Sequence, residues 1–143
     1  MKRSTKTIEL SFERTIPAPQ AEVFDAWLNP EIPGTPWHEN DELILDPKED
    51  GLFYWLTRGT AHYGRFTEIN RPGRIQHTWM SRYTMGEEST VTLTFEKKGE
   101  GTLMTLIHSD LPDDERSMAH DAGWKYFLDK LVEHFGSGVR PRK

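Results

Sequence analysis

Cysteine is absent from this 143-residue chain, which excludes a disulfide framework, a thiolate metal site and a cysteine nucleophile. The chain also lacks an apolar run long enough to span a membrane, and its N-terminus lacks the apolar segment of a secretory signal peptide. We therefore expect a cytoplasmic protein with no membrane span.

An excess of positive charge is missing as well. The formal net charge is −5, whereas a nucleic-acid or anionic-membrane binder needs a basic stripe that neutralises phosphates. Basic residues cluster only at the two ends, in "MKRSTK" and "VRPRK", and we interpret both as solvated tails. No nucleic-acid partner is expected.

Large aromatic residues are abundant by comparison. Only 35% of the residues are hydrophobic, yet 11% are aromatic, including five Trp and seven Phe. A chain of this length fits one domain with a sizeable core. Because the apolar material comes in a few large rings, it can line a cavity as well as fill a core.

The N-terminal part predicts a strand, a short helix and a broken turn. "IELSFERTI", residues 8–16, alternates with period two, as in a half-buried strand. "PAPQAEVFDAWLNP" has apolar residues at helical spacing until Pro30. "EIPGTPWHEN" has too many prolines and glycines for a long helix, so we expect a broken turn or a single helical turn ending near Trp37.

Six short runs with strand character follow. They are "ELILD", "GLFYWLT", "AHYGRFTEI", "RIQHTWMSRY", "STVTLTFEKK" and "TLMTLIHSDL". The separators are short and rich in turn residues, which predicts an antiparallel meander. In the fourth run, alternation places Ile75, His77, Trp79, Ser81 and Tyr83 on one face.

The stretch "AHDAGWKYFLDKLVEHF", residues 119–135, predicts a long amphipathic helix. Its apolar stripe must face the sheet, and Gly123 precedes Trp124 in its first turns. The order of elements predicts an α+β fold, in which a curved antiparallel sheet wraps on this helix and leaves a cavity between them. We see no boundary that would divide the chain.

The ordered set of motifs resembles the SRPBCC, or START-like, superfamily. "RTIPAPQAEVFDAW" is similar to its opening signature, "YGRFTEINRPGRIQHTW" to its glycine and tryptophan strands, and "HDAGWKYFLDKL" to its last helix. The branch that it resembles most is the activator of heat shock protein 90 ATPase homologue family. The resemblance implies the helix-grip (START-like, Bet v 1-like) fold in a single domain, residues 1–143, with an ordered core from about residue 7 to 136.

Members of this superfamily hold apolar molecules between sheet and helix. Strand alternation, together with the family pattern for residues 103–108, gives the side chains that we expect to face such a ligand. They are Trp37, Phe53, Trp55, His62, Phe66, His77, Trp79, Met104, His108, Trp124 and Phe127. Each of these residues could instead be an ordinary core residue. For Trp124 we favour neither role, because lining a cavity and packing a core use the same apolar aromatic surface.

Three of these residues are histidines. Imidazoles in an apolar pocket could orient a polar ligand group, transfer protons or bind a metal. The chain has no His-x-His or His-Glu-x-x-His spacing, so we predict neither a metal site nor a cofactor. "HSD" at 108–110 does not predict a hydrolase triad, since neighbours on a strand point to opposite faces.

Three functions are compatible with the sequence. The first is binding of a small hydrophobic molecule in a cavity of about 300–1,000 Å³. The second is a protein-interaction module, like the chaperone ATPase activator, with a chaperone or another protein as partner. The third is a cyclase-like or hydrolase-like enzyme that uses a pocket histidine and Glu68, which we expect to face inward near His77 or Arg14.

Catalysis is not the favoured reading, and we assign no catalytic residue. A further expectation concerns the outer face of the last strand. Leu103, Thr105 and Ile107 make this face unusually apolar, which suggests a homodimer contact.

Overall fold

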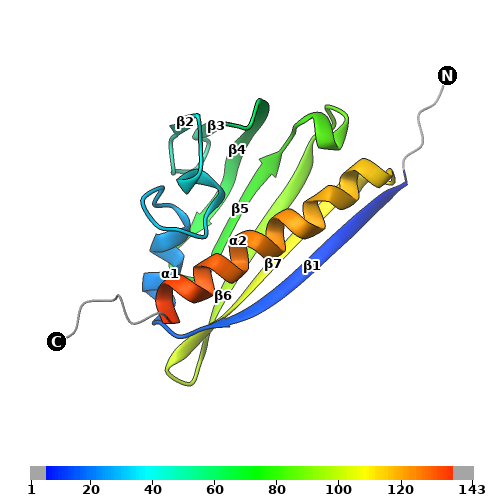
Figure 1. Ribbon diagram of the computed structural model, residues 1–143. Helices are drawn as coiled ribbons and strands as arrows, with labels where there is room; N and C mark the ends of the chain where they lie inside the picture. Colours follow the sequence, from blue (N-terminus) through cyan, green and yellow to red (C-terminus); the bar gives the residue numbers. More distant parts are fainter. Residues whose placement is uncertain (1–5, 137–143) are drawn as a thin grey trace.

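One seven-stranded antiparallel sheet and one long helix make up most of the computed structural model (Figure 1), which describes residues 6–136. The strands are β1 (Thr7–Ile16), β2 (Glu42–Leu45), β3 (Leu52–Thr57), β4 (Thr60–Asn70), β5 (Arg74–Trp79), β6 (Ser89–Lys98) and β7 (Gly101–Pro112). The helices are α1 (Gln20–Trp27) and α2 (Ala119–Gly136), with short 3₁₀ turns η1 (Pro36–His38), η2 (Arg82–Thr84) and η3 (Glu115–Met118). Apart from Lys6, the predicted basic tails lie outside the described residues.

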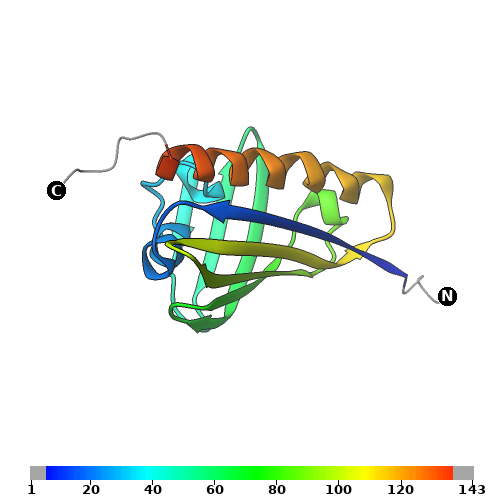
Figure 2. The same cartoon turned by 90° about the horizontal axis from the view of Figure 1, so that it is seen from below.

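The sheet order is β1-β7-β6-β5-β4-β3-β2. The meander from β2 to β7 is thus continuous, and β1 is added to its far edge. The view in Figure 2 shows α2 lying across one face of this sheet. This arrangement confirms the predicted α+β fold and its helix-grip architecture.

The apolar stripe of α2 explains why the helix lies there. Trp124, Leu128, Leu131 and Phe135 are all buried between helix and sheet, and burial of each such side chain contributes about 1.5–3 kcal/mol. An ion pair between Arg14 Nε and Asp129 Oδ1, 2.9 Å long, joins β1 to the same helix. The C-terminal half of α2 thus contacts β1.

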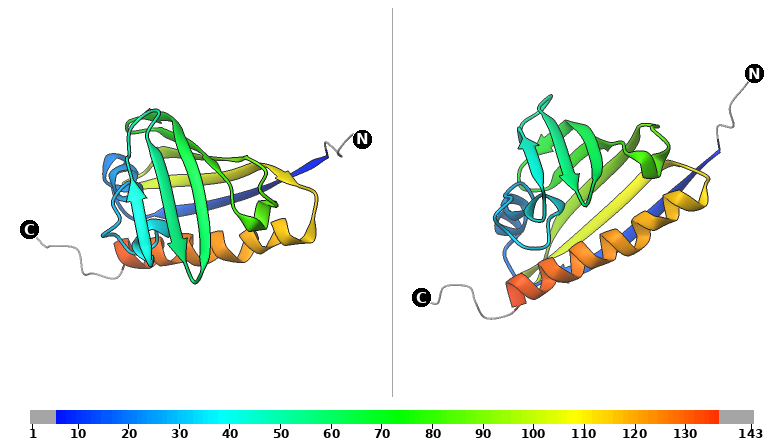
Figure 3. Two further views of the ribbon diagram at one scale, coloured as in Figure 1. Left: turned by 90° about the horizontal axis from the view of Figure 1, so that it is seen from above. Right: turned by 45° about the horizontal axis from the view of Figure 1, so that its top comes forward.

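The segment after α1 packs on the C-terminal half of α2. Figure 3 shows it beside this helix end, at the opposite end from η2. Gly34 has a φ of 105°, and a Cβ atom there would lie 2.4 Å from the backbone nitrogen of Leu131. The indole N–H of Trp37 donates to the carbonyl oxygen of Trp27 at 2.9 Å. The broken turn predicted here is thus a packed element of the core.

The fourth predicted strand is shorter than expected. β5 ends at Trp79, and the chain then turns through η2, where Ser81 and Thr84 form a reciprocal capping box. Met85 and Gly86 both have positive φ values, which completes the reversal toward β6. The prediction that Ser81 and Tyr83 continue the strand is therefore wrong, because local side-chain capping ended it.

The inward orientation predicted for Glu68 is also wrong. The β4–β5 pairing shifts between Phe66 and Glu68, so that Glu68 lies opposite Gln76. A β-bulge of this kind reverses the alternation of the residues that follow it. The Glu68 carboxylate accepts a 2.8 Å hydrogen bond from Arg74 Nε, and it is bonded to neither His77 nor Arg14.

Leu103, Thr105 and Ile107 lie on the outer face of the sheet, as predicted, but the most exposed apolar side chains of this face lie elsewhere. Leu103, Thr105 and Ile107 are only half-exposed, and polar residues of β1 flank them. The exposed large apolar side chains of the sheet are Ile44 (59%), Leu52 (61%) and Tyr63 (46%), on β2, β3 and β4. Among the described residues, no helix combines the length and apolar character that crossing a membrane requires.

Candidate functional site

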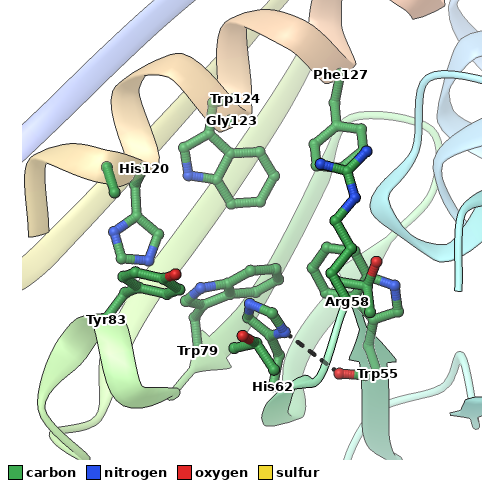
Figure 4. A pocket seen from close by; sticks show the side chains of 12 residues that line it. Trp55, Arg58, His62, Trp79, Tyr83, His120, Gly123, Trp124 and Phe127 are labelled. Atoms are coloured by element: carbon green, nitrogen blue, oxygen red, sulfur yellow. Dashed lines mark hydrogen bonds between the residues drawn. The ribbon is translucent and has the colours of Figure 1, made fainter. Parts of the chain in front are cut away.

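A pocket of about 320 Å³ lies between the first half of α2 and strands β3–β5 (Figure 4). Its volume is at the lower end of the range for small-molecule sites, as predicted for a sheet-helix cavity. The lining residues come from β3, the turn after it, β4, β5, η2 and α2. They are Trp55, Thr57, Arg58, Thr60, His62, Trp79, Tyr83, Ala119, His120, Gly123, Trp124 and Phe127.

Aromatic rings form the walls of this pocket. The ring centres of Trp79 and Trp124 are 5.0 Å apart, those of Trp55 and Trp79 are 5.8 Å apart, and Phe127 lies 6.0 Å from Trp55. The rings are tilted or edge-on to one another, as aromatic pairs prefer. They hold each other in place and present apolar faces to the pocket.

Gly123 borders open space between α2 and the sheet. A Cβ atom at this position would meet no other atom within 4 Å, although the residue is well inside the helix. Glycine lowers helix stability relative to alanine by about 1 kcal/mol. The residue that weakens the helix therefore lies where α2 borders the pocket. This position accounts for the glycine that precedes Trp124.

A chain of hydrogen bonds orients Trp124. Its indole N–H donates to His108 Nδ1 at 3.0 Å, and His108 Nε2 lies 2.8 Å from the Ser89 hydroxyl oxygen. The Ser89 hydroxyl in turn donates to the carbonyl oxygen of Trp79 at 2.6 Å. Because Nδ1 must accept and Nε2 must donate, His108 is a neutral imidazole in one defined tautomer.

Burial keeps the imidazoles in and beside the pocket uncharged. It lowers the pKa of His62 to about 4, and the backbone hydrogen bond to Trp55 opposes this effect only in part. It likewise lowers the pKa of His108, with the nearby His120 and His77 adding to the effect. The pKa of His120 is lowered for the same reason. At neutral pH the pocket is therefore polar on one side but carries no imidazolium.

Five of the eleven predicted ligand-facing residues line the pocket. These are Trp55, His62, Trp79, Trp124 and Phe127. The other six lie deeper in the core, at 3% exposure or less. They are Trp37, Phe53, Phe66, His77, Met104 and His108. Alternation identified the inner face correctly, but it did not indicate where along that face the helix rises away from the sheet.

His77 is the clearest case of a core residue in this group. It is completely buried, with the rings of Phe53 and Phe66 each 5.3 Å from its own. Its Nδ1 atom lies 3.0 Å from the carbonyl oxygen of Thr78, and burial lowers its pKa to about 4. It supports the pocket floor and does not contact the cavity.

Several lining residues were not predicted as a ligand-facing set. Thr57, Arg58 and Thr60 belong to the β3–β4 hairpin, and Tyr83 comes from η2. Ala119 and His120 begin α2. His120 had a usable signal, since it precedes Trp124 by one helical turn and so shares its face. The hairpin residues had none, because their reach depends on sheet curvature.

A second hollow of about 300 Å³ adjoins the pocket. It adds Glu39, Ala122 and Tyr126, and the residues that it shares with the first are Trp55, Thr57, Arg58, Gly123 and Phe127. The Tyr126 hydroxyl donates to Glu39 Oε2 at 2.8 Å, and this bond raises the tyrosine pKa. Figure 4 shows the Arg58 side chain reaching toward Phe127 at this side. Arg58 thus lines both hollows.

The pocket combines apolar aromatic walls with a few polar side chains. No carboxylate lines the inner pocket, so its histidines have no acidic partner there. Within residues 6–136, no three His, Asp or Glu side chains gather as metal ligands would. The pairing of a histidine with Glu68, on which the enzyme hypothesis depended, does not occur.

Comparison with solved structures identifies the fold independently. A protein of Rhizobium leguminosarum, described as putative and uncharacterized, is 24% identical, with a TM-score of 0.73 over 96% of this chain and 99% of that one. An HSP90 activator from Plasmodium falciparum is 24% identical, with a TM-score of 0.69 over 89% and 93%. The Aha1 dimer from Colwellia psychrerythraea is 15% identical, with a TM-score of 0.74 over 92% and 98%.

No curated protein matches the sequence significantly. A family model does match, from residue 17 to 136, and this range runs from the turn after β1 to the end of α2. It includes every residue that lines the pocket. The chain belongs to the Activator of Hsp90 ATPase homolog 1-like protein family.

Proposed function

We propose that this protein binds a small, largely apolar molecule containing an aromatic ring between α2 and strands β3–β5. The observation that carries this proposal is the open space at Gly123, bounded by Trp55, Trp79, Trp124 and Phe127. A packed core leaves few voids larger than a water molecule. A helix position at which alanine would both fit and stabilise is better explained by a ligand than by packing.

Native mass spectrometry of the protein purified from its own host tests this proposal. We expect a mass difference between gentle and denaturing conditions that corresponds to a small organic molecule. Replacement of Gly123 by leucine should abolish this difference, because the new side chain would occupy the pocket. A bound molecule that survives this replacement would contradict the assignment of the site.

We propose, as a second function, that the outer face of β2–β4 binds another copy of this chain. Ile44, Tyr54 and Tyr63 are paired in register across the three strands, and the two tyrosine rings are 5.4 Å apart. Leu52 adds a further exposed apolar side chain to this face. β2 is an edge strand, so the patch lies where a second sheet can approach. The relative from Colwellia psychrerythraea is itself a dimer.

Sedimentation velocity tests this second proposal. We expect Leu52→Lys to convert a dimer to a monomer, because a buried unpaired charge is costly. Thr105→Lys is the matched control, since it places the same charge on the outer face of β7. If Thr105→Lys disrupts the dimer and Leu52→Lys does not, the contact lies on the outer face of β7, as predicted from the sequence, and the proposal for β2–β4 is wrong.

A further inference from the structure

Among the described residues that line the pocket, Arg58 is the only one with a permanently charged side chain. The pocket histidines add no charge at neutral pH, since burial lowers the pKa of both His62 and His120. Arg58 itself is exposed, and its side chain extends from the β3–β4 hairpin toward Phe127 (Figure 4). A molecule that enters the pocket therefore meets one positive charge, on a side chain that it can reach.

The guanidinium group of Arg58 makes no ion pair and no hydrogen bond within residues 6–136. The nearby Asp41 carboxylate accepts from the backbone N–H of Arg58, at 3.0 Å from Oδ2, and not from its side chain. The Glu39 carboxylate, in the adjoining hollow, accepts from the Tyr126 hydroxyl. The side-chain donors of Arg58 are thus available to a ligand.

The backbone at Arg58 is unusual for an arginine. Arg58 and Gly59 join β3 to β4 in a two-residue hairpin, with φ values of 51° and 78°. Positive φ at both positions is typical of a type I′ turn, whose first position favours asparagine, aspartate or glycine. Larger side chains are disfavoured in this left-handed conformation. A long cationic side chain here is better explained by contact with a ligand than by the needs of the turn.

We infer that the ligand carries a single carboxylate group, which pairs with Arg58 while the aromatic ring of the ligand occupies the pocket. This inference rests on the proposed function, because it specifies the molecule that the same pocket takes. The planar guanidinium group matches the two oxygens of a carboxylate, to which it can donate two parallel hydrogen bonds. The ligand class is thus an aromatic carboxylic acid in its anionic form.

Ligands of other charge fit this site less well. Arg58 would repel a cationic group. A phosphate monoester carries more than one negative charge at neutral pH, and the Glu39 carboxylate adds another beside the same guanidinium. The net charge of the chain is −5, which disfavours anions in general. A preference for an anion must therefore arise locally, at Arg58.

Three probes on one ring frame test the inference with the native chain. They are 2-naphthoate, the neutral 2-naphthamide and the cationic 2-naphthylmethylammonium ion, titrated at neutral pH by isothermal calorimetry. We expect 2-naphthoate to bind about three- to tenfold more tightly than the amide, the effect of one charge-assisted contact at an exposed site. The cation should bind more weakly than the amide. Equal binding of 2-naphthoate and 2-naphthamide, or tightest binding of the cation, would overturn the inference but leave the pocket assignment intact.

Two variants assign the preference to Arg58. Arg58→Asn should reduce 2-naphthoate binding to the level of the amide, and it should unfold at no lower urea concentration than the native chain, because asparagine suits the turn. Arg65→Gln is the matched control. It removes the same charge from the outer face of β4, where Arg65 pairs with Asp50 at 2.9 Å, and it should retain the preference.

The outcomes separate this inference from the proposed function. A preference for 2-naphthoate that persists in Arg58→Asn, or that is lost equally in both variants, would overturn the inference. Binding of no probe by the native chain would overturn the proposed function itself, and the inference with it.

Discussion

Gly123 and Gly34 show how differently two glycines can be used in one chain. Gly123 faces open space, whereas Gly34 is pressed against the backbone of α2 in a conformation that favours glycine. At position 123 the absence of a side chain leaves the pocket open. At the second it is absent because none would fit.

We predict that Gly123→Ala stabilises the protein by about 0.5–1 kcal/mol, because alanine has the higher helix propensity and meets nothing. Urea unfolding monitored by circular dichroism measures the change. Gly34→Ala is the matched control. It should destabilise the protein by about 2 kcal/mol or more, since both the positive φ and the Leu131 backbone oppose a side chain. Destabilisation by Gly123→Ala would contradict our reading of that position.

The buried histidines predict a loss of stability in mild acid. Burial lowers the pKa of His77 to about 4, whereas an unfolded histidine has a pKa of about 6.5. Between these two values the unfolded chain takes up a proton that the folded chain does not. The free energy of unfolding therefore falls as the pH drops from about 6.5 to 4, by up to roughly 3 kcal/mol for this residue.

His77→Phe tests the contribution of that residue. Urea unfolding at about pH 7 and pH 4.5 should show a smaller difference in the variant than in the native protein. Some pH dependence should persist, because the pKa of His62 is also lowered to about 4. An unchanged pH dependence in His77→Phe would contradict this assignment.

At the scale of elements, the chain from Trp124 through His108 and Ser89 to Trp79 connects α2 with β7, β6 and β5. We predict that Ser89→Ala destabilises the protein by about 1–3 kcal/mol, because it leaves the buried N–H of His108 without an acceptor. Thr94→Ala, on the outer face of β6, should change stability by less than about 0.5 kcal/mol. Thermal unfolding compares the two, and equal effects would show that the connection contributes little.

The elements themselves were largely predictable from the sequence. Period-two alternation and turn residues gave the strands, and the apolar stripe of 119–135 gave α2 and the face that it buries. Two local features of the strands could not be predicted from the sequence. The capping box at Ser81 follows the end of β5 and places Tyr83 in η2, beside the pocket. The bulge before Glu68 orients the Glu68 carboxylate outward. The capping box is a local effect of Ser81 and Thr84 that interrupts an alternating pattern, whereas the bulge depends on how β4 pairs with β5.

At the scale of the whole molecule, strand alternation predicted only some of the residues that line the pocket. Alternation marks an inner face, but the cavity covers only the part of it where α2 and the curved sheet separate. Trp55, His62, Trp79, Trp124 and Phe127 lie in that part, and residues such as His77 and Met104 lie below it. Residues supplied by the hairpin, such as Arg58, could be identified only once the strands were placed.

Affinity for an aromatic probe in the native protein and in two Gly123 variants tests the central claim most directly. Isothermal calorimetry with 2-naphthol and 2-methoxynaphthalene should show binding to the native chain, weaker binding to Gly123→Ala and none to Gly123→Leu, while circular dichroism shows that all three are folded. The account predicts this graded loss because each added side chain fills the same space. Equal affinity for all three proteins, or no binding to any, would contradict it.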